Sequence, residues 1–453
     1  MTNDRSWWNT RVLPPGIEAD ESSLGPGSVR EIAAALRSGQ VDLAAMPWRE
    51  VAARIGAAAE NLLDPGHTSR AEALEGLGET AGLSSQMAEA VLDGMARDWC
   101  TDRLVDTVEA EPYLADALDG VTDGPGGAKV RARGRQLTLH IGAGTVPGIG
   151  ATSLIRALLV KSAVWLKPGR GDVAIPVVLA RSLIEADPVL ARTLAVTYWP
   201  ADALPDQVLQ VADLVVAYGS NETIGALRRA LPPTTPLVAY HHRLGLGAVA
   251  REALQDPEAV RHLADEVANA VAMFDQKGCV SPHTLFVERG GAVAPEEWCA
   301  VLADAMDAAA VRLPPGRLSA GEASAVQQMR GTAELKAAVD PTVRVFAGRD
   351  LSWTVLLDSE GDMASPCLAR TVRLKPVHDL EELPDLLRPI GSVLQSVGFA
   401  GPHERAARLA ESLSKVGVTR VCGFRQQPFP PPWWRHDGAQ PLTPLVRWTE
   451  LDL

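Results

Sequence analysis

Residues 136–150 read QLTLHIGAGTVPGIG, and this stretch decides the expected fold. Its first six residues form an apolar run that is typical of a buried strand. A glycine-rich segment, 142–150, follows directly, and a helical pattern begins at residue 151. Glycines between a strand and a helix let the backbone approach a phosphate while helix N–H groups face it. The glycines do not follow the GxGxxG spacing, so a tight strand-to-helix turn without a ligand is an equally good interpretation.

Four further apolar runs extend this pattern toward the C-terminus. They are expected strands at residues 163–167, 194–198, 214–218 and 237–240. Helical patterns lie between them, for example over residues 173–186. Strands that alternate with helices predict a doubly wound parallel sheet.

The flanking residues predict three more parts. Residues 29–118 show helical periodicity with Ser84 as an N-cap, whereas residues 1–30 are expected to be extended or loosely packed. After residue 247 a second α/β domain is expected, with helices at 250–274, 295–309 and 380–387 and strands at 284–287, 343–346, 353–357 and 370–374. We therefore expect a helical N-terminal region over residues 1–125 and a Rossmann-type cofactor domain over residues 126–247. A catalytic domain is expected over residues 248–425, followed by a tail, residues 426–453, that packs on the body or on a neighbouring subunit.

Composition excludes several classes of protein. The chain has 453 residues, a net charge of −13 and five cysteines. The negative charge argues against a general nucleic-acid binder, because phosphate binding needs clustered Lys and Arg. The cysteines are odd in number and scattered, and none forms a CxxC motif, which argues against a disulfide framework and against a zinc ribbon. This pattern favours a cytoplasmic location, and no metal site is expected. The sequence contains no uninterrupted run of about 18 apolar residues, so no membrane span is expected. No signal peptide is expected either.

The residues after the second expected strand indicate which nucleotide would be bound. A fold that selects NAD usually places an acidic residue there, on the ribose 2′-hydroxyl. This chain has Lys167 and Arg170 instead, and both cations suit a 2′-phosphate. We therefore expect NADPH, with a solvated loop charge as the alternative interpretation of Arg170. A further strand-to-helix turn at Gly219 and Ser220 is expected to cradle the pyrophosphate.

Cys279 is the candidate nucleophile. Cys100, Cys299, Cys367 and Cys422 are interpreted as small buried apolar residues. Cys279 instead follows Gly278 in a polar loop, where Lys277 would favour a thiolate. From the residues alone, a reactive role and a structural role are equally supported.

Five motifs in order resemble a known family. They are Gly144-Thr145-Val146-Pro147-Gly148, Leu166-Lys167-Pro168, Gly219-Ser220-Asn221-Glu222, His242-Arg243-Leu244-Gly245 and Phe274-Asp275-Gln276-Lys277-Gly278-Cys279-Val280-Ser281-Pro282. The late run Trp434-Arg435-His436-Asp437-Gly438 also fits. The chain is similar, from about residue 60 to the end, to the LuxC-type acyl-CoA reductases (fatty acid reductases) of bacterial bioluminescence, a branch of the aldehyde dehydrogenase superfamily.

The resemblance implies an aldehyde-dehydrogenase-like α/β fold and assigns roles by position. It implies that Cys279 is the nucleophile and that Lys167 lies by the adenosine ribose. It also implies that Gly219 and Ser220 lie near the pyrophosphate and that Gly144 and Pro147 belong to the cofactor site. Arg170 stands where NAD-preferring relatives carry Glu, which strengthens the expectation of NADPH.

Two departures from the wider superfamily are informative. Thr145 aligns with the Asn that holds the oxyanion, so the Cys279 N–H and the Thr145 hydroxyl are expected to take that role. Arg243 aligns with the Glu that activates water for hydrolysis of the acyl-enzyme. A reductase does not need that water, so the missing Glu favours reduction.

The predicted function is NADPH-dependent reduction of an acyl thioester to an aldehyde through an acyl-cysteine. The donor is acyl-CoA or an acyl carrier protein, and a homo-oligomer is expected because relatives self-associate. His241, His242 and His283 are candidates for proton transfer, although each is more often structural. The alternatives are an aldehyde dehydrogenase that oxidises an aldehyde, or a non-catalytic acyl-binding partner in a multienzyme assembly.

Overall fold

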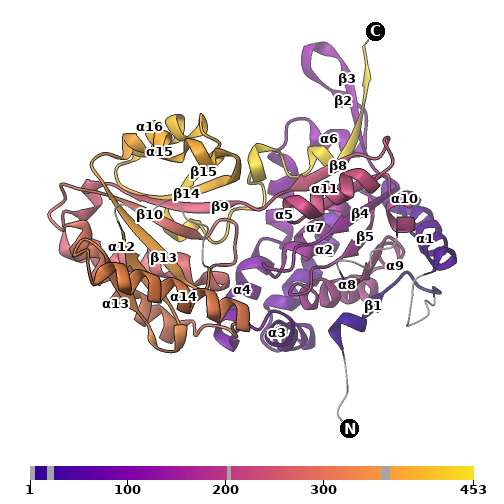
Figure 1. Ribbon diagram of the computed structural model, residues 1–453. Helices are drawn as coiled ribbons and strands as arrows, with labels where there is room; N and C mark the ends of the chain where they lie inside the picture. Colours follow the sequence, from indigo (N-terminus) through magenta and orange to yellow (C-terminus); the bar gives the residue numbers. More distant parts are fainter. Residues whose placement is uncertain (1–5, 18–24, 201–205, 359–367, 453) are drawn as a thin grey trace. The chain divides into compact units, whose positions relative to one another are not determined.

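The computed structural model describes residues 6–17, 25–200, 206–358 and 368–452. The chain divides into two compact units (Figure 1). Unit 1 comprises Met1–Ala81, Ala88–His241 and Pro431–Leu453, and unit 2 comprises Gly82–Met87 and His242–Pro430. The N-terminal helices, the expected cofactor strands and the C-terminal residues thus share one unit. The four-part division expected from the sequence stays a prediction.

Unit 1 contains a six-stranded sheet in the order β1-β6-β5-β4-β7-β8. Five of its strands are parallel and coincide with the predicted ones: β4 (Leu137–Ile141), β5 (Ala163–Lys167), β6 (Leu194–Thr197), β7 (Leu214–Tyr218) and β8 (Leu237–Tyr240). The sixth, β1 (Arg11–Val12), pairs antiparallel with β6 at the edge. Every residue of β4 and β5 is buried, as expected for parallel strands that helices cover on both faces. The predicted doubly wound sheet is confirmed.

In unit 1, helices lie in the chain between β1 and β4 and then alternate with the parallel strands. They are α1 (Pro26–Ala45), α2 (Trp48–Leu63), α3 (Thr68–Thr80), α4 (Ser85–Arg97, whose first turn belongs to unit 2), α5 (Thr101–Glu109), α6 (Leu114–Asp119), α7 (Ile149–Leu159), α8 (Ala174–Ala186), α9 (Pro188–Ala191), α10 (Asp206–Val211) and α11 (Asn221–Ala230). The helical character predicted for the N-terminal region is confirmed. Ser84 caps α4 as predicted, because its Oγ accepts the N–H of Met87 at 3.3 Å.

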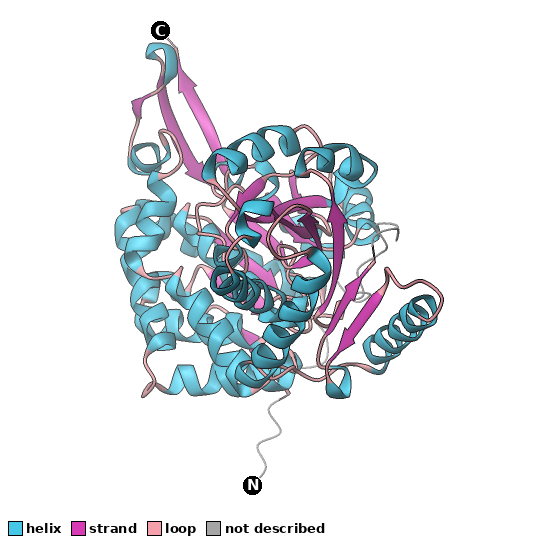
Figure 2. Ribbon diagram, turned by 90° about the vertical axis from the view of Figure 1, so that its left-hand side faces the viewer, coloured by secondary structure: helices cyan, strands magenta, loops and turns pink. Residues whose placement is uncertain are grey.

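A three-stranded antiparallel sheet lies beside the parallel sheet in unit 1, in the order β16-β3-β2. Its strands are β2 (Thr122–Asp123), β3 (Lys129–Gly134) and β16 (Val446–Leu451). Figures 1 and 2 show them as a projecting ribbon that carries the C-terminal residues. Glu111 adds a second attachment of the tail, because its carboxylate accepts the N–H groups of Leu442 and Thr443, both at 2.6 Å. The sequence did not indicate this sheet.

Unit 2 contains a seven-stranded sheet in the order β11-β12-β13-β10-β9-β14-β15. The predicted strands correspond to β10 (Pro282–Glu288), β11 (Arg344–Ala347), β12 (Thr354–Leu357) and β13 (Thr371–Val377). Three strands were not predicted: β9 (Leu244–Val249), β14 (Leu394–Ala400) and β15 (Arg420–Cys422). Among the strands of this sheet that the structure describes, β11 alone is antiparallel to its neighbour.

Helices cover both faces of the unit 2 sheet. The helices are α12 (Pro257–Ala272), α13 (Pro295–Arg312), α14 (Ala320–Ala337), α15 (Leu383–Leu387) and α16 (His403–Ser414). One apolar core joins α12 and α13 to the sheet, and another joins α15 and α16 to it from the opposite side (Figure 1). α12 begins seven residues later than predicted, at Pro257, and α14 was not predicted. Across the described ranges, no helix is both long and apolar enough to cross a lipid bilayer.

Candidate functional site

The carboxyl edge of the unit 1 sheet has the topology of a ligand site. β4 lies between β5 and β7, and the chain leaves β4 toward β5 and β6 before it returns to form β7 on the other side. Ligands of open α/β sheets bind where the strand order reverses in this way, beyond the carboxyl ends of the strands. The predicted cofactor residues Gly144, Lys167 and Gly219 all follow or end β4, β5 or β7.

The glycines after β4 serve close packing between two loops. A Cβ on Gly144 would lie 2.9 Å from the backbone N of Arg170, and one on Gly169 would lie 2.2 Å from the backbone C of Ala143. A Cβ on Gly171 would lie 2.3 Å from the carbonyl O of Gly144. The loop after β4 and the loop after β5 therefore interlock through backbone contacts that no larger residue allows.

Asp172 already occupies the N-terminus of α7, the helix that follows the glycine-rich segment. Its Oδ1 accepts the N–H of Gly148 at 2.7 Å, and its Oδ2 accepts the N–H of Gly150 at 2.6 Å. The side chain is 1% exposed, and burial raises the pKa of Asp172 to about 7 against the lowering effect of the two N–H groups. A helix end whose first N–H groups bind a buried carboxylate does not offer them to a phosphate.

Lys167 and Arg170 differ in their surroundings. Lys167 ends β5, is 8% exposed, and holds its Nζ 5.7 Å from the centre of the Tyr198 ring. Burial lowers the pKa of Lys167, and no carboxylate of the described residues offsets this effect. Arg170 is exposed, with its guanidinium 5.7 Å from the centre of the Trp8 ring. A buried ammonium without a carboxylate partner suits an anionic or hydroxyl-bearing ligand.

Gly219 and Ser220 form the turn between β7 and α11. The N–H of Gly219 donates to the carbonyl of Tyr240 at 3.1 Å, which ties the turn to β8. The Oγ of Ser220 accepts the N–H of Thr223 at 3.3 Å. Unlike α7, α11 has only this hydroxyl as its cap, and its first residues are exposed. This helix end is therefore the one of the two that can face a phosphate.

An aromatic stack lies beside this turn. Tyr218, the last residue of β7, stacks on Tyr240 with ring centres 4.6 Å apart, and Tyr240 stacks on His436 at 4.5 Å. Trp434 contacts His436 at 4.8 Å. The C-terminal motif noted in the sequence thus packs against the carboxyl ends of β7 and β8.

Thr145 and Pro147 belong to the loop between β4 and α7. Thr145 is exposed, so its hydroxyl is accessible to a ligand, whereas Pro147 is buried. Lys167, Ser220 and Thr145 together provide a cation, a helix end and a hydroxyl at the carboxyl edge of one sheet. This set of groups fits a dinucleotide, and the individual roles stay predictions.

In unit 2, Cys279 lies in a tight turn between residues 273–276, a 3-10 segment, and β10. The N–H of Ser281 donates to the carbonyl of Gly278 at 3.0 Å and closes the turn. A Cβ on Gly278 would lie 3.0 Å from the Oγ of Ser281, so a larger residue here would have to displace this hydroxyl slightly. Cys279 itself is half-buried. Its thiol is thus held on a short, hydrogen-bonded turn at the start of a buried strand.

The three residues before Lys277 have a left-handed backbone. The φ angles are 56° at Phe274, 50° at Asp275 and 64° at Gln276. Each such residue other than glycine costs on the order of 1–3 kcal/mol and persists only where its surroundings hold it. All three side chains are buried. The turn that carries Cys279 is therefore preceded by a strained and firmly packed segment.

Neighbouring groups modify the expectations for the thiol. Lys277, expected to favour the thiolate, pairs with Glu322 at 3.1 Å, so part of its charge is offset. Among the other cysteines, Cys299 is buried, and burial raises the pKa of Cys299 to about 12. Burial also raises the pKa of Cys100 and of Cys422. Cys367 lies outside the described residues.

Arg243 and the histidines fall at the start of β9 and β10. Arg243 donates through Nη1 to the carbonyl of Ser392 at 2.5 Å. His283 is 8% exposed, and burial, with a smaller effect of His242, lowers the pKa of His283 to about 4. His283 is therefore neutral at pH 7. His241 belongs to unit 1, where its Nδ1 lies 3.0 Å from Oδ1 of Asn221.

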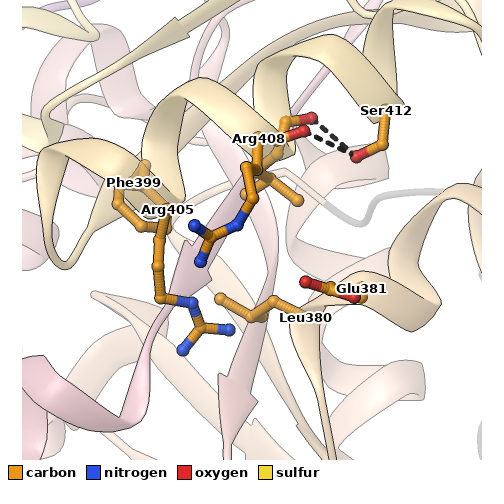
Figure 3. A pocket seen from close by; sticks show the side chains of 7 residues that line it. Leu380, Glu381, Phe399, Arg405, Arg408 and Ser412 are labelled. Carbon is orange, nitrogen blue, oxygen red and sulfur yellow. Dashed lines mark hydrogen bonds between the residues drawn. The ribbon is translucent and has the colours of Figure 1, made fainter.

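A surface pocket of unit 2 contains none of the predicted site residues. Figure 3 shows its lining, with Arg405 and Arg408 of α16 facing Leu380 and Glu381. Arg405 also binds the fully buried carboxylate of Glu288 at 2.6 Å and 2.8 Å. We interpret this region as a structural ion-pair network that anchors α16 to the sheet.

Sequence reasoning missed three residues that shape these sites. Asp172 gave no signal, because an aspartate in a loop after a strand is common. Asp275 was part of a recognised motif but received no role. Arg370, which binds Asp275 at 2.7 Å, begins an expected strand, and nothing in the sequence links it to Cys279.

Comparisons with known proteins agree with this architecture. The chain resembles the structure of an NAD-dependent benzaldehyde dehydrogenase from Corynebacterium glutamicum, with a TM-score of 0.71 and 17% identity over 98% of this chain and 95% of that one. It also resembles the NADP-dependent glyceraldehyde-3-phosphate dehydrogenase from Bacillus halodurans, with a TM-score of 0.70 and 17% identity over 95% and 92% of the two chains. These likenesses show an aldehyde-dehydrogenase fold, as predicted, and the fold alone does not select between the two cofactors.

The sequence itself is similar to a narrower group. A long-chain acyl-protein thioester reductase from Aliivibrio fischeri is 26% identical over 372 residues, which are 81% of this chain and 74% of the relative. The model of the family described as acyl-CoA reductase (LuxC) matches residues 43–448. The protein is therefore an oxidoreductase that acts on acyl or aldehyde groups, and the chain belongs to the acyl-CoA reductase (LuxC) family.

Proposed function

We propose that this enzyme reduces an acyl thioester to an aldehyde with NADPH through an acyl group on Cys279. The observation that carries the proposal is the setting of Cys279, a half-buried thiol on a closed turn after a strained segment. The name of the Aliivibrio fischeri relative, a long-chain acyl-protein thioester reductase, supports the substrate class. The donor is acyl-CoA or an acyl carrier protein.

Acyl transfer comes first in the proposed sequence. The Cys279 thiolate attacks the thioester carbonyl and forms a new C–S bond, the C–S bond to the donor breaks, and the donor leaves as a thiolate that takes a proton from water. The backbone N–H of Cys279 would donate to the oxyanion. NADPH, when held by the unit 1 residues proposed below, would supply the hydride that reduces the acyl carbonyl. The C–S bond to Cys279 then breaks, which releases the aldehyde and restores the thiolate.

The cofactor site is proposed at the carboxyl edge of the unit 1 sheet. Lys167 would bind the adenosine ribose, because its ammonium is buried there without a carboxylate partner. Exposed Arg170 would take the 2′-phosphate, and Gly219 and Ser220 would face the pyrophosphate at the N-terminus of α11. Gly144 contributes by its packing against the loop of Arg170. Pro147, which is buried, would shape the loop that carries Thr145.

Arg243 supports reduction over oxidation. A guanidinium that donates to the carbonyl of Ser392 cannot accept a proton from water. The acyl-enzyme would then persist long enough for hydride transfer. A homo-oligomer is proposed as well, from the self-association of relatives.

Intact-protein mass spectrometry tests the acyl-enzyme. The protein is mixed with palmitoyl-CoA, or with a palmitoyl carrier protein, without NADPH, and a mass gain of one acyl group at Cys279 is expected. Cys279→Ala should lose the gain and retain NADPH fluorescence quenching. Cys422→Ala is the matched control, a half-buried thiol of the same unit whose pKa burial raises, and it should acylate normally. Acylation of Cys279→Ala, or conversion of aldehyde plus NADP to acid as the main reaction, would refute the proposal.

A further inference from the structure

A buried ion pair lies directly before the turn of Cys279. The side chains of Arg370 and Asp275 are 1% and 7% exposed. Oδ1 of Asp275 accepts from Nη2 of Arg370 at 2.7 Å and from its Nε at 3.0 Å. Oδ2 of Asp275 accepts the N–H of Gly316 at 3.1 Å. Both carboxylate oxygens are thus bound, so the side chain has one permitted position.

The remaining donors of Arg370 connect this pair to the segment between α13 and α14. Nη1 donates to the carbonyl of Leu313 at 2.7 Å, and Nη2 donates to the carbonyl of Pro314 at 3.3 Å. A Cβ on Gly316 would lie 2.7 Å from Oδ2 of Asp275, so this position requires glycine. The arginine therefore joins the segment before Cys279 to the backbone of residues 313–316.

Gln276 makes a parallel set of contacts and is fully buried. Its Nε2 donates to the carbonyl of Thr371 at 2.7 Å, and its Oε1 accepts the N–H of Thr371 at 2.8 Å. Nε2 also donates to the carbonyl of Pro282 at 2.9 Å. Pro282 follows the Cys279 turn, so this amide holds the residues on both sides of the nucleophile at once.

The contacts of Asp275 with Arg370 and of Gln276 with Thr371 form what we call the clamp, and the backbone is strained on both of its sides. Residues 274–276 have φ angles of 56°, 50° and 64°, and residues 368–370 have φ angles of 59°, 51° and 56°. Two left-handed runs are therefore held against each other by the Asp275–Arg370 and Gln276–Thr371 contacts. Strain of this kind, retained by specific contacts, concentrates where a fold fixes reactive groups.

We propose that Arg370, Asp275 and Gln276 are positioning residues that set the orientation of the Cys279 turn for attack on the thioester. None of the three needs to touch the substrate. Their effect reaches the thiol through the backbone, because Gln276 is three residues before Cys279 and binds Pro282 three residues after it. The inference rests on the proposed function, since it assumes that Cys279 accepts the acyl group.

The test compares two buried ion pairs of the same unit. Arg370→Met removes the clamp, and Arg405→Met removes the pair with buried Glu288, at the surface pocket of Figure 3. Both variants should lower the melting temperature. Only Arg370→Met should slow acylation of Cys279 per folded molecule, by about 10- to 100-fold, because small misplacements of reacting groups have effects of this size. NADPH affinity should stay within about twofold in both.

A second readout needs no acyl substrate. The rate of Cys279 alkylation by iodoacetamide is measured from pH 6 to 10, and its profile should change in Arg370→Met and not in Arg405→Met. Arg370→Lys keeps the positive charge but loses the two-pronged guanidinium, so its acylation and alkylation rates should lie between those of wild type and Arg370→Met. If Arg370→Met does not fold, Arg370→Lys replaces it in the comparison. Equal acylation and alkylation in the Arg370 and Arg405 variants would overturn the inference. Absence of acylation in the wild type, with an altered alkylation profile in Arg370→Met, would instead refute the proposed function alone.

Discussion

Replacement of Asp172 by Asn tests the assignment of the glycine-rich segment after β4. The carboxylate accepts the N–H groups of Gly148 at 2.7 Å and Gly150 at 2.6 Å from a position that is 1% exposed. An amide keeps one acceptor and turns an N–H₂ group toward the second donor. One buried N–H then lacks an acceptor, at a cost of about 1–3 kcal/mol.

The pH dependence distinguishes this carboxylate from an ordinary cap. Burial raises the pKa of Asp172 from 3.8 to about 7. A raised folded-state pKa gives stability that is complete below pH 4 and is lost as the pH rises through 7. At about 1.36 kcal/mol per pH unit this is about 4 kcal/mol, of which about 3 kcal/mol is lost between pH 5 and pH 8. Asp172→Asn should therefore be less stable than wild type at pH 5, and the difference should close or reverse by pH 8.

Urea unfolding at pH 5, 6, 7 and 8, followed by circular dichroism, measures this difference. Ser162→Ala is the matched control, because the buried Ser162 Oγ accepts the N–H of Arg135 at 2.8 Å and does not titrate in this range. It should lower stability by a similar amount at every pH. A difference between wild type and Asp172→Asn that stays constant with pH within about 0.5 kcal/mol, the size of an ordinary surface substitution effect, would refute the reasoning.

Three further predictions concern other parts of the enzyme. Arg170→Glu should weaken NADPH binding by about 10- to 100-fold and leave NADH binding nearly unchanged, because one charge-assisted contact to the 2′-phosphate is lost; fluorescence titration checks this, and equal weakening of both cofactors would contradict it. Arg243→Glu should release free fatty acid from the acyl-enzyme in the absence of NADPH, because it introduces a general base; product analysis that finds no increase in acid speaks against the role. Glu288→Gln should destabilise unit 2 by about 1–3 kcal/mol at pH 7, because its amide N–H₂ group replaces one of the oxygens that accept from the guanidinium groups of Arg251 and Arg405. Burial by itself would raise the pKa of Glu288, but hydrogen bonds from Arg405 and Arg251 hold this pKa well below its usual range. The stabilisation is therefore present above the ordinary carboxyl pKa and declines as the pH falls through the lowered pKa. A stability difference between variant and wild type that stays constant down to pH 3 would exclude this explanation.

The sequence predicted those strands whose own residues form a recognisable apolar pattern. β4 and β5 are mostly apolar and are followed directly by Gly142 and Pro168, so their pattern is local. β9 reads LGLGAV and escaped prediction, because glycine weakens strand propensity. A Cβ on Gly245 would lie 2.3 Å from the carbonyl O of Val280, and one on Gly247 would lie 2.4 Å from Cδ2 of Leu285. These glycines are required by Val280, in the turn after Cys279, and by Leu285 on β10, so only the tertiary structure explains them.

The glycines of the expected phosphate loop carry the same lesson for the site. Their spacing was compatible with either a ligand loop or a tight turn. The structure shows that Gly144 packs on the loop of Arg170 and that Asp172 binds the N–H groups of Gly148 and Gly150. Which of two glycine turns can face a phosphate depends on what already caps the following helix. That cap comes from a residue more than 20 positions away and cannot be read from the spacing of the glycines.

The motif around Cys279 shows how far local preference reaches. Aspartate tolerates a left-handed backbone better than most residues, so Asp275 fits its φ of 50°. Phe274 and Gln276 have no such preference, and their conformations must be held by contacts elsewhere. For Gln276 those contacts are to Thr371, 95 residues away, beside the arginine that binds Asp275. A variant without Arg370 would keep every residue of the recognised motif but would lose the ion pair that helps to hold Asp275 in its left-handed conformation. In the proposed mechanism the motif supplies the reactive thiol, and the distant arginine is expected to maintain its geometry.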